Sequence, residues 1–205
     1  MKNALMMAVI FVAGAELASA QDTYRDPYPY TSYYNEQWTG HSNLFMGFKN
    51  LDKDDWGTLD RQIEIAWLND FRAKDWPVSM AIDFRIAFSG DTEDFGGTDI
   101  ELDATTIELN IGVRKIFMEK TKIRPFVGAG LSLQRASASF EFGSASASES
   151  GVGIGYWMDA GVYIAMSRGF MLGLELSYSQ AEVDMDGTDV QAGGFQVGFS
   201  LGGHF

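Results

Sequence analysis

The sequence of 205 residues contains no cysteine and only two histidines. Without cysteine, the chain has no disulfide bonds, thiolate metal sites or thiol nucleophiles. Basic residues are also scarce, with 15 Lys and Arg against 28 Asp and Glu, and the net charge of −13 argues against binding to nucleic-acid phosphates. We therefore expect no metal, no cofactor and no nucleic-acid partner. No apolar run reaches the ~18 residues of a membrane-spanning helix.

The longest apolar stretch, residues 4–15, lies near the N-terminus between Lys2 and Ala18-Ser19-Ala20. A base, a short apolar core and small residues at the end predict a secretory signal peptide over residues 1–20. A short buried helix or a membrane anchor is the alternative. Residues 21–42 combine many tyrosines with two prolines, which favours an irregular periplasmic segment or a plug at the mouth of the next domain.

Residues 43–205 contain eight segments that alternate between apolar residues and small or polar ones. This period of two is typical of β-strands with two different faces. We expect the last segment to pair with the first and close a barrel, which removes both free edges. The segments are residues 43–49, 61–68, 78–88, 106–117, 127–134, 154–166, 170–178 and 194–205. The predicted fold is an all-β, eight-stranded, antiparallel, up-and-down transmembrane β-barrel in a single domain.

The connections between these segments alternate between long acidic ones and short basic ones. Long loops at one end and short turns at the other are typical of membrane barrels, so we expect four external acidic loops and periplasmic termini. Residues 136–151, rich in Ser and Ala, predict a flexible loop or an extended hairpin tip. A soluble, lipocalin-like barrel would carry its apolar face inward. Two features favour the membrane barrel: glycines crowd the polar face, as a narrow lumen requires, and aromatic residues gather at both strand ends.

This architecture and the closing stretch Val197-Gly198-Phe199-Ser200-Leu201-Gly202-Gly203-His204-Phe205 resemble the small outer-membrane barrels of Gram-negative bacteria. Those include the membrane domain of outer membrane protein A, outer membrane protein X and the opacity-type surface proteins. The resemblance implies a bacterial outer-membrane location and contact with lipid and lipopolysaccharide. It also implies recognition by the barrel-assembly machinery, with Phe199, Leu201 and Phe205 as the assembly signal. We expect a monomer.

Charged residues occur on the polar face of the strands, where they would point into the lumen. Because isolated charges are costly in a narrow lumen, we expect them to pair across strands and fill it. A gated, low-conductance pore is the alternative. The expected network comprises Lys49, Glu64, Asp83, Arg85, Glu108, Arg114, Asp159 and Glu175.

The two histidines, His41 and His204, should be neighbours across the closing strand pair. They could form a pH-sensitive pair or serve as polar rim residues. His41-Ser42 invites comparison with barrel enzymes that modify lipid A, but no carboxylate at a known spacing orients the histidine. The loop acids are solvated by default, with loose divalent-ion binding as the alternative. The sequence therefore predicts a protein that is not an enzyme and that contributes envelope integrity or surface interaction, with a narrow pore or a lipid A-modifying enzyme as alternatives.

Overall fold

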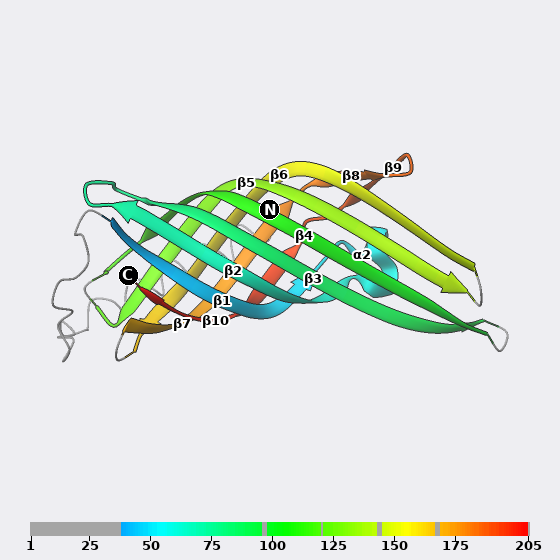
Figure 1. Ribbon diagram of the computed structural model, residues 1–205, viewed down its shortest axis with the longest axis horizontal. Helices are drawn as coiled ribbons and strands as arrows, with labels where there is room; N and C mark the ends of the chain where they lie inside the picture. Colours follow the sequence, from blue (N-terminus) through cyan, green and yellow to red (C-terminus); the bar gives the residue numbers. More distant parts are fainter. Residues whose placement is uncertain (1–37, 96–97, 120, 143–144, 167–168, 205) are drawn as a thin grey trace.

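The computed structural model describes residues 38–95, 98–119, 121–142, 145–166 and 169–204. Eight of its strands form a closed antiparallel barrel in the order β1-β10-β7-β6-β5-β4-β3-β2, so the last strand pairs with the first (Figure 1). The predicted eight-stranded barrel is confirmed. The predicted signal peptide, residues 1–20, lies outside the described residues. The barrel strands are β1 (Trp38–Asn50), β2 (Arg61–Ala73), β3 (Ser79–Phe95), β4 (Thr98–Ile116), β5 (Ile123–Phe142), β6 (Ala145–Ala165), β7 (Phe170–Gln180) and β10 (Phe195–His204).

Seven of the eight barrel strands are longer than the sequence predicted, and β10 is slightly shorter. β1 begins at Trp38 rather than at Asn43, and β2 continues to Ala73 rather than ending at Leu68. The third and fifth connections, predicted as long loops, are continuations of β3–β4 and β5–β6. The prediction of a long loop over residues 89–105 is therefore wrong, whereas over residues 136–151 the structure shows the extended hairpin, the alternative to a flexible loop. Figure 1 shows the two hairpins reaching far beyond the rest of the barrel, at what we call the hairpin end. The opposite end, which carries the C-terminus and the short turns, we call the terminal end.

The apolar residues change faces along the extended strands. In the part of β4 nearer the terminal end, Leu109 and Ile111 point outward and are exposed, whereas Glu108 and Asn110 are buried in the lumen. Beyond Thr105 the pattern is inverted, since Ala104 is buried on the inner side. An outward apolar face suits lipid, and an inward one suits a protein surrounded by water. The inversion therefore marks the height at which the surroundings of β4 change from hydrocarbon to water.

Outward-facing aromatic residues lie near both ends of the apolar band. Phe48, Phe88 and Tyr156 lie toward the hairpin end, and Trp67 and Phe170 toward the terminal end; each is exposed. Such paired belts match the two interfaces of a bilayer. Within the described residues, no helix has the length and apolarity needed to cross a bilayer.

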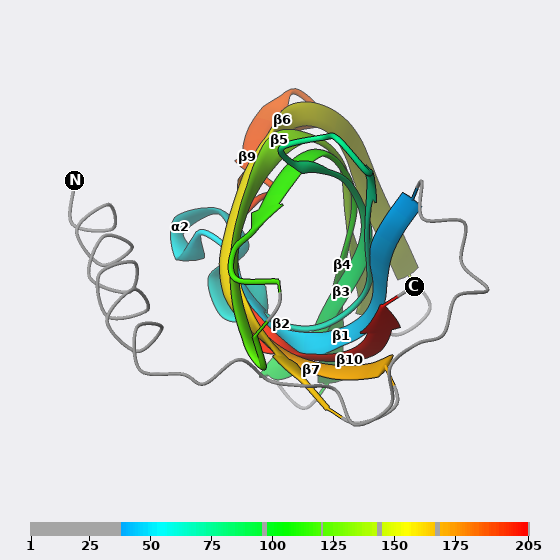
Figure 2. The ribbon, with the colours of Figure 1, turned by 90° about the vertical axis from the view of Figure 1, so that its left-hand side faces the viewer.

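Paired glycines let the narrow barrel curve. Gly112 and Gly130 are direct partners across β4 and β5. A Cβ on Gly112 would lie 2.7 Å from the Cα of Gly130, closer than real contacts allow. Glycine is therefore required where the backbones of β4 and β5 approach closely. Figure 2 shows the ring of strands from the terminal end.

The remaining elements lie in two connections at the hairpin end. The β1–β2 connection contains α2 (Lys53–Trp56) and the short 3₁₀ helix η1 (Gly57–Leu59), and the β7–β10 connection contains the hairpin β8 (Glu182–Met185) and β9 (Thr188–Gln191). We call these four elements the cap. The cap shares a hydrophobic core with the inner face of the extended strands. The buried members of this core are Leu51, Trp56, Leu59, Ala104, Ala136, Val183, Met185 and Ala192.

Candidate functional site

The candidate site is the interior of the barrel, from the cap to the terminal end. Nearest the cap, the buried ammonium of Lys49 donates to Glu108 Oε1 (2.5 Å), to Thr106 Oγ1 (3.1 Å) and to the carbonyl oxygen of Ala192 (2.8 Å). Glu108 Oε1 also accepts from Ser179 Oγ (3.0 Å). This group connects β1, β4 and β7 and joins the lumen to the cap.

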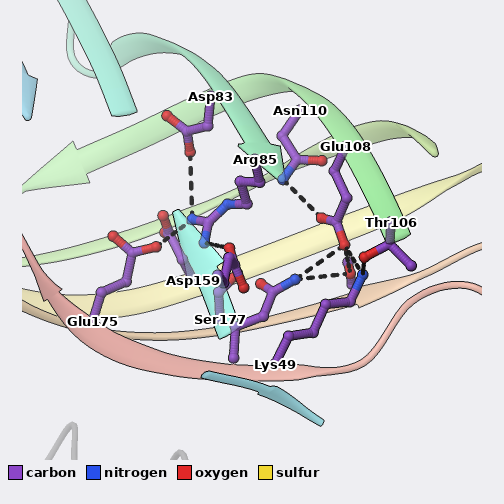
Figure 3. A network of polar contacts seen from close by, with 12 residues as sticks. Lys49, Asp83, Arg85, Thr106, Glu108, Asn110, Asp159, Glu175 and Ser177 are labelled. Atoms are coloured by element: carbon purple, nitrogen blue, oxygen red, sulfur yellow. Dashed lines mark hydrogen bonds and ion pairs between the residues drawn. The ribbon is translucent and has the colours of Figure 1, made fainter. Parts of the chain in front are cut away.

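Arg85 occupies the middle of the lumen. Its Nη1 donates to Glu64 Oε1 (2.9 Å). Its Nη2 donates to Glu175 Oε1 and lies 3.8 Å from Asp83 Oδ2 (Figure 3). The guanidinium also lies 5.3 Å from the centre of the Phe45 ring, within the range of a cation–π contact. Arg85 thus links β2, β3 and β7 across the barrel.

Arg114 forms the next group toward the terminal end and is fully buried. Its Nη2 donates to Asp83 Oδ2 (2.7 Å) and Asp159 Oδ2 (2.5 Å), and its Nε also donates to Asp159 Oδ2 (3.1 Å). The rings of Phe126 and Trp157 lie 5.3 and 5.8 Å from the guanidinium. The buried aromatic rings fill lumen space that the charges leave.

All eight residues expected in the lumen lie there, and the structure brings them into the three groups above. Sequence reasoning missed Asp70, which is also buried and lies 3.8 Å from Arg114. Among the described residues, the lumen therefore holds six buried carboxylates and three buried cations. The carboxylates are Glu64, Asp70, Asp83, Glu108, Asp159 and Glu175, and the cations are Lys49, Arg85 and Arg114.

At the terminal end, Asp70 orients His41. The Asp70 Oδ1 lies 2.7 Å from His41 Nδ1, so the expectation that no carboxylate orients this histidine is wrong. The His41 ring also stacks on Tyr163, with centroids 5.5 Å apart, and lies 6.5 Å from the His204 ring. Ser42 points to the opposite face, because its Oγ accepts a hydrogen bond from the outward-facing Trp67 (2.9 Å). His41 and Ser42 therefore do not form a catalytic pair.

A cavity of about 240 Å³ opens beside His41 and Asp70 at the terminal end. Arg72 and Glu119 line its rim and form a two-pronged ion pair, with both N–O distances 2.5 Å. Within the part of the chain that the structure describes, no cluster of three or more His, Asp or Glu side chains is arranged to hold a metal ion.

The cap lies over the other end of the lumen. Its strand β8 lies against β6, where a Cβ on Gly151 or Gly153 would overlap the carbonyl oxygen of Asp184 or Glu182. Trp56 Nε1 of α2 donates to the carbonyl oxygen of Gln191 (2.7 Å), which ties the two parts of the cap together. The hairpin end of the lumen is thus covered by a packed core.

The last strand presents an alternating outer face. Phe199 and Leu201 point outward and are exposed, whereas Ser200 is buried. Phe205, the third residue of the expected assembly signal, lies outside the described residues.

The family model for the outer membrane protein beta-barrel domain matches residues 6–202. The chain belongs to this family. It is therefore a bacterial outer-membrane protein, as the apolar band and the aromatic belts require. No curated protein matches the chain.

Solved structures of other outer-membrane barrels share its fold. The chain is similar to Neisserial surface protein A, with 15% identity, a TM-score of 0.52, and coverage of 82% of this chain and 97% of that one. It is similar to Ail, the attachment invasion locus protein of Yersinia pestis, in complex with the heparin analogue sucrose octasulfate, with 14% identity, a TM-score of 0.55, and coverage of 82% and 99%. It is also similar to a major outer membrane protein of Thermus thermophilus, with 10% identity, a TM-score of 0.54, and coverage of 82% and 99%. At these identities, the likeness is one of fold.

Proposed function

We propose that this outer-membrane barrel is a closed, non-enzymatic surface protein that acts through its extended hairpins. The observation that supports the proposal is that the lumen is blocked at two successive levels along the barrel axis. Three buried cations hold carboxylates from opposite sides of the lumen, and a cap with its own hydrophobic core covers the hairpin end. Neither obstruction suits a protein whose task is solute passage.

The rigidity of the lumen supports the same view. Separating Arg85 from Glu64 and Glu175 would leave charges buried without partners, which typically costs about 3–5 kcal/mol. A permeation path would have to break such contacts for each passing ion. The proposal therefore favours a structural role for the lumen charges over the narrow pore.

Planar-bilayer recording tests the closed barrel. The mature chain, shown to be folded by heat-modifiable gel migration, should give no discrete current steps. A variant in which residues 182–191 are replaced by a short Gly-Ser linker should stay silent, because the charged lumen is still filled. Steps in the cap variant alone would assign closure to the cap, and steps in the unmodified protein would refute the proposal.

The absence of enzymatic activity is supported by the environment of His41. Its ring lies on the inner side with Asp70 and Tyr163, whereas Ser42 points outward beside Trp67. For the lipid A-modifying alternative, the adjacent hydroxyl of Ser42 is therefore not placed against this histidine. Expression of the protein in a Gram-negative host should leave the lipid A mass spectrum unchanged, and a new acylated or deacylated species would contradict the proposal.

We also propose that the hairpin end is external and the terminal end periplasmic, with Phe199 and Leu201 recognised during barrel assembly. Lipopolysaccharide would then surround the band of outward aromatic residues near the hairpin end. Protease added to intact cells tests the orientation. It should cut at the hairpin end and leave an epitope tag at the C-terminus intact.

The charge of the hairpin end favours a partner unlike the sulfated ligand bound to Ail. Exposed basic residues in the described part of this end are confined to Lys53, Arg61 and Arg135. Exposed acidic residues there include Asp52, Asp54, Asp55, Glu101, Asp103, Glu141, Glu149, Glu182, Asp184, Asp186 and Asp189. Because like charges repel, a polyanion should not bind, and sucrose octasulfate should give no heat of binding in calorimetry.

A further inference from the structure

The extended parts of β3, β4, β5 and β6 form an open four-stranded sheet beyond the barrel, and its inner face is apolar. In one row across the sheet, Asp91 pairs with Leu102, Leu102 with Phe140 and Phe140 with Ala147. In these strands, successive side chains alternate between faces, so all members of the row lie on the face that continues the lumen side. Phe140 is 39% exposed although it stands in the middle of this face.

The next row toward the barrel has the same character. It runs from Ser89 through Ala104 and Ala138 to Glu149. Ala104 is buried by the cap, and Ala138 is partly buried against it. Leu102 also packs partly against the cap, so the cap covers the base of the apolar face and leaves Phe140 open.

The outer face of the same sheet is polar. Its corresponding row runs from Thr92 through Glu101 and Glu141 to Ser146. Glu101 and Glu141 are direct partners and are both exposed. Water can cover the polar outer face. The exposed apolar inner face instead indicates a binding surface.

Acidic residues border the open apolar face and indicate the charge of that partner. Asp91 stands at one side of the Leu102–Phe140 row, and Glu149 stands at the opposite side of the neighbouring row. The exposed Asp186 and Asp189 of the β8–β9 hairpin lie beside the partly buried Val190, which packs against the same core. An apolar centre with acidic borders complements a segment with an apolar stripe and basic flanks.

The dimensions of the face suit one helix. Four strands ~4.8 Å apart span ~14 Å, and an α-helix with its side chains is ~10–12 Å wide. Two rows on one face of a strand are separated by ~7 Å, a little more than the ~5.4 Å pitch of a helix, so the two apolar rows can contact side chains on two successive turns. A second copy of this chain is disfavoured as the occupant, because it would bring another acidic surface against this one.

We propose that the inner face of the extended β3–β6 sheet, centred on Leu102 and Phe140, binds cationic amphipathic helical peptides. The proposal rests on the proposed surface function and names the class of partner. The apolar stripe of the peptide would lie on Leu102, Ala138 and Phe140, and its Lys or Arg residues would face Asp91 and Glu149. Binding should weaken with added salt, because exposed charge pairs are screened.

The test uses the mature protein in nanodiscs of phosphatidylcholine, which carries no net charge. The probe is a fluorescein-labelled peptide of 15 Leu and Lys residues with Leu at helical i, i+3, i+4, i+7 spacing, and anisotropy measures its binding. A peptide of the same composition with dispersed Leu residues and empty nanodiscs serve as controls. Saturable binding of the amphipathic peptide alone is expected.

Matched variants separate the two faces of the sheet. Phe140→Ser should weaken binding about 10-fold, because the apolar contact at the centre is lost. Asp91→Asn with Glu149→Gln should weaken it several-fold and reduce its salt dependence. Glu101→Gln with Glu141→Gln removes the same charge from the outer face and should change affinity less than about 2-fold.

Equal effects of the two double variants would show general electrostatic attraction and overturn the proposal, as would unchanged affinity of Phe140→Ser. Heat-modifiable migration shows that each variant has folded. The closed barrel is measured separately by bilayer recording. Silent bilayers without peptide binding would refute the docking face alone, whereas current steps with peptide binding would refute only the closed lumen.

Discussion

Replacement of Arg114 by methionine should lower the free energy of unfolding more than the same replacement of an exposed arginine. Methionine keeps much of the length and removes the charge, so Asp83 and Asp159 lose the donor that contacts them at 2.5–3.1 Å. Arg114 is 0% exposed, and water cannot replace these bonds without opening the lumen. Breaking a buried pair in this way costs about 3–5 kcal/mol. We therefore expect the free energy of unfolding of Arg114→Met to fall by about that amount.

Urea-induced unfolding in phospholipid vesicles, followed by tryptophan fluorescence, measures this loss. Arg135→Met is the control, since Arg135 is exposed and should cost less than about 1 kcal/mol. Neutralising the partners as well, in Arg114→Met with Asp83→Asn and Asp159→Asn, should restore part of the stability, because the two carboxylates that Arg114 hydrogen-bonds are then replaced by neutral amides. A loss for Arg114→Met no greater than that for Arg135→Met would refute the view that the lumen charges act as one interlocked network.

Three further predictions concern backbone approach and the cap. Gly130→Val should reduce the yield of heat-modifiable, folded barrel, because even a Cβ would lie 2.5 Å from the Cα of its partner across the strand; Gly203→Ala, whose added Cβ would meet only one atom at 3.2 Å, should fold normally. Gly153→Val should displace β8 from β6 and make the β8–β9 hairpin a site of rapid proteolysis, whereas an unchanged cleavage rate would contradict the packing described for the cap. Trp56→Phe removes a single donor and should speed hydrogen exchange in β9 about 5-fold, consistent with a bond worth about 1 kcal/mol, and no change would place the ordering of β9 elsewhere.

The strands inside the bilayer could be predicted because lipid and lumen impose opposite chemistry on alternate residues. The extensions carry an equally regular signal: Ile100, Leu102 and Ala104 alternate with acidic residues in β4. Their apolar residues, however, have the opposite parity to Ile107 and Leu109 lower in the same strand. A search that assumes the apolar residues of a strand all face outward therefore interprets the segment where they face inward as a charged loop. The change of phase is itself the signal, because it marks where lipid ends.

Membership of the lumen could be predicted from parity, but the choice of partners could not. Arg85 meets Glu175 from 90 positions away, on a strand that is not its neighbour, and only the curvature of the closed ring sets that meeting. Asp70 was missed because β2 was expected to end at Leu68. It has the same parity as Glu64, so a strand two residues longer would have included it and the contact with His41.

The cap has a consequence for how the barrel opens. β1 and β10 come from the two ends of the described chain, and they meet at the only barrel contact that no connecting turn joins within residues 38–204. The cap bridges the β1–β10 pair at the hairpin end. Lys49 on β1 donates to the carbonyl oxygen of Ala192, just before β10, and Trp56 of α2 donates to the carbonyl oxygen of Gln191. The cap thereby acts as a latch. The contacts between these two connections can form only after β1 and β10 have paired. They therefore add little to the rate of barrel closure and mainly slow the separation of β1 from β10 in the folded barrel.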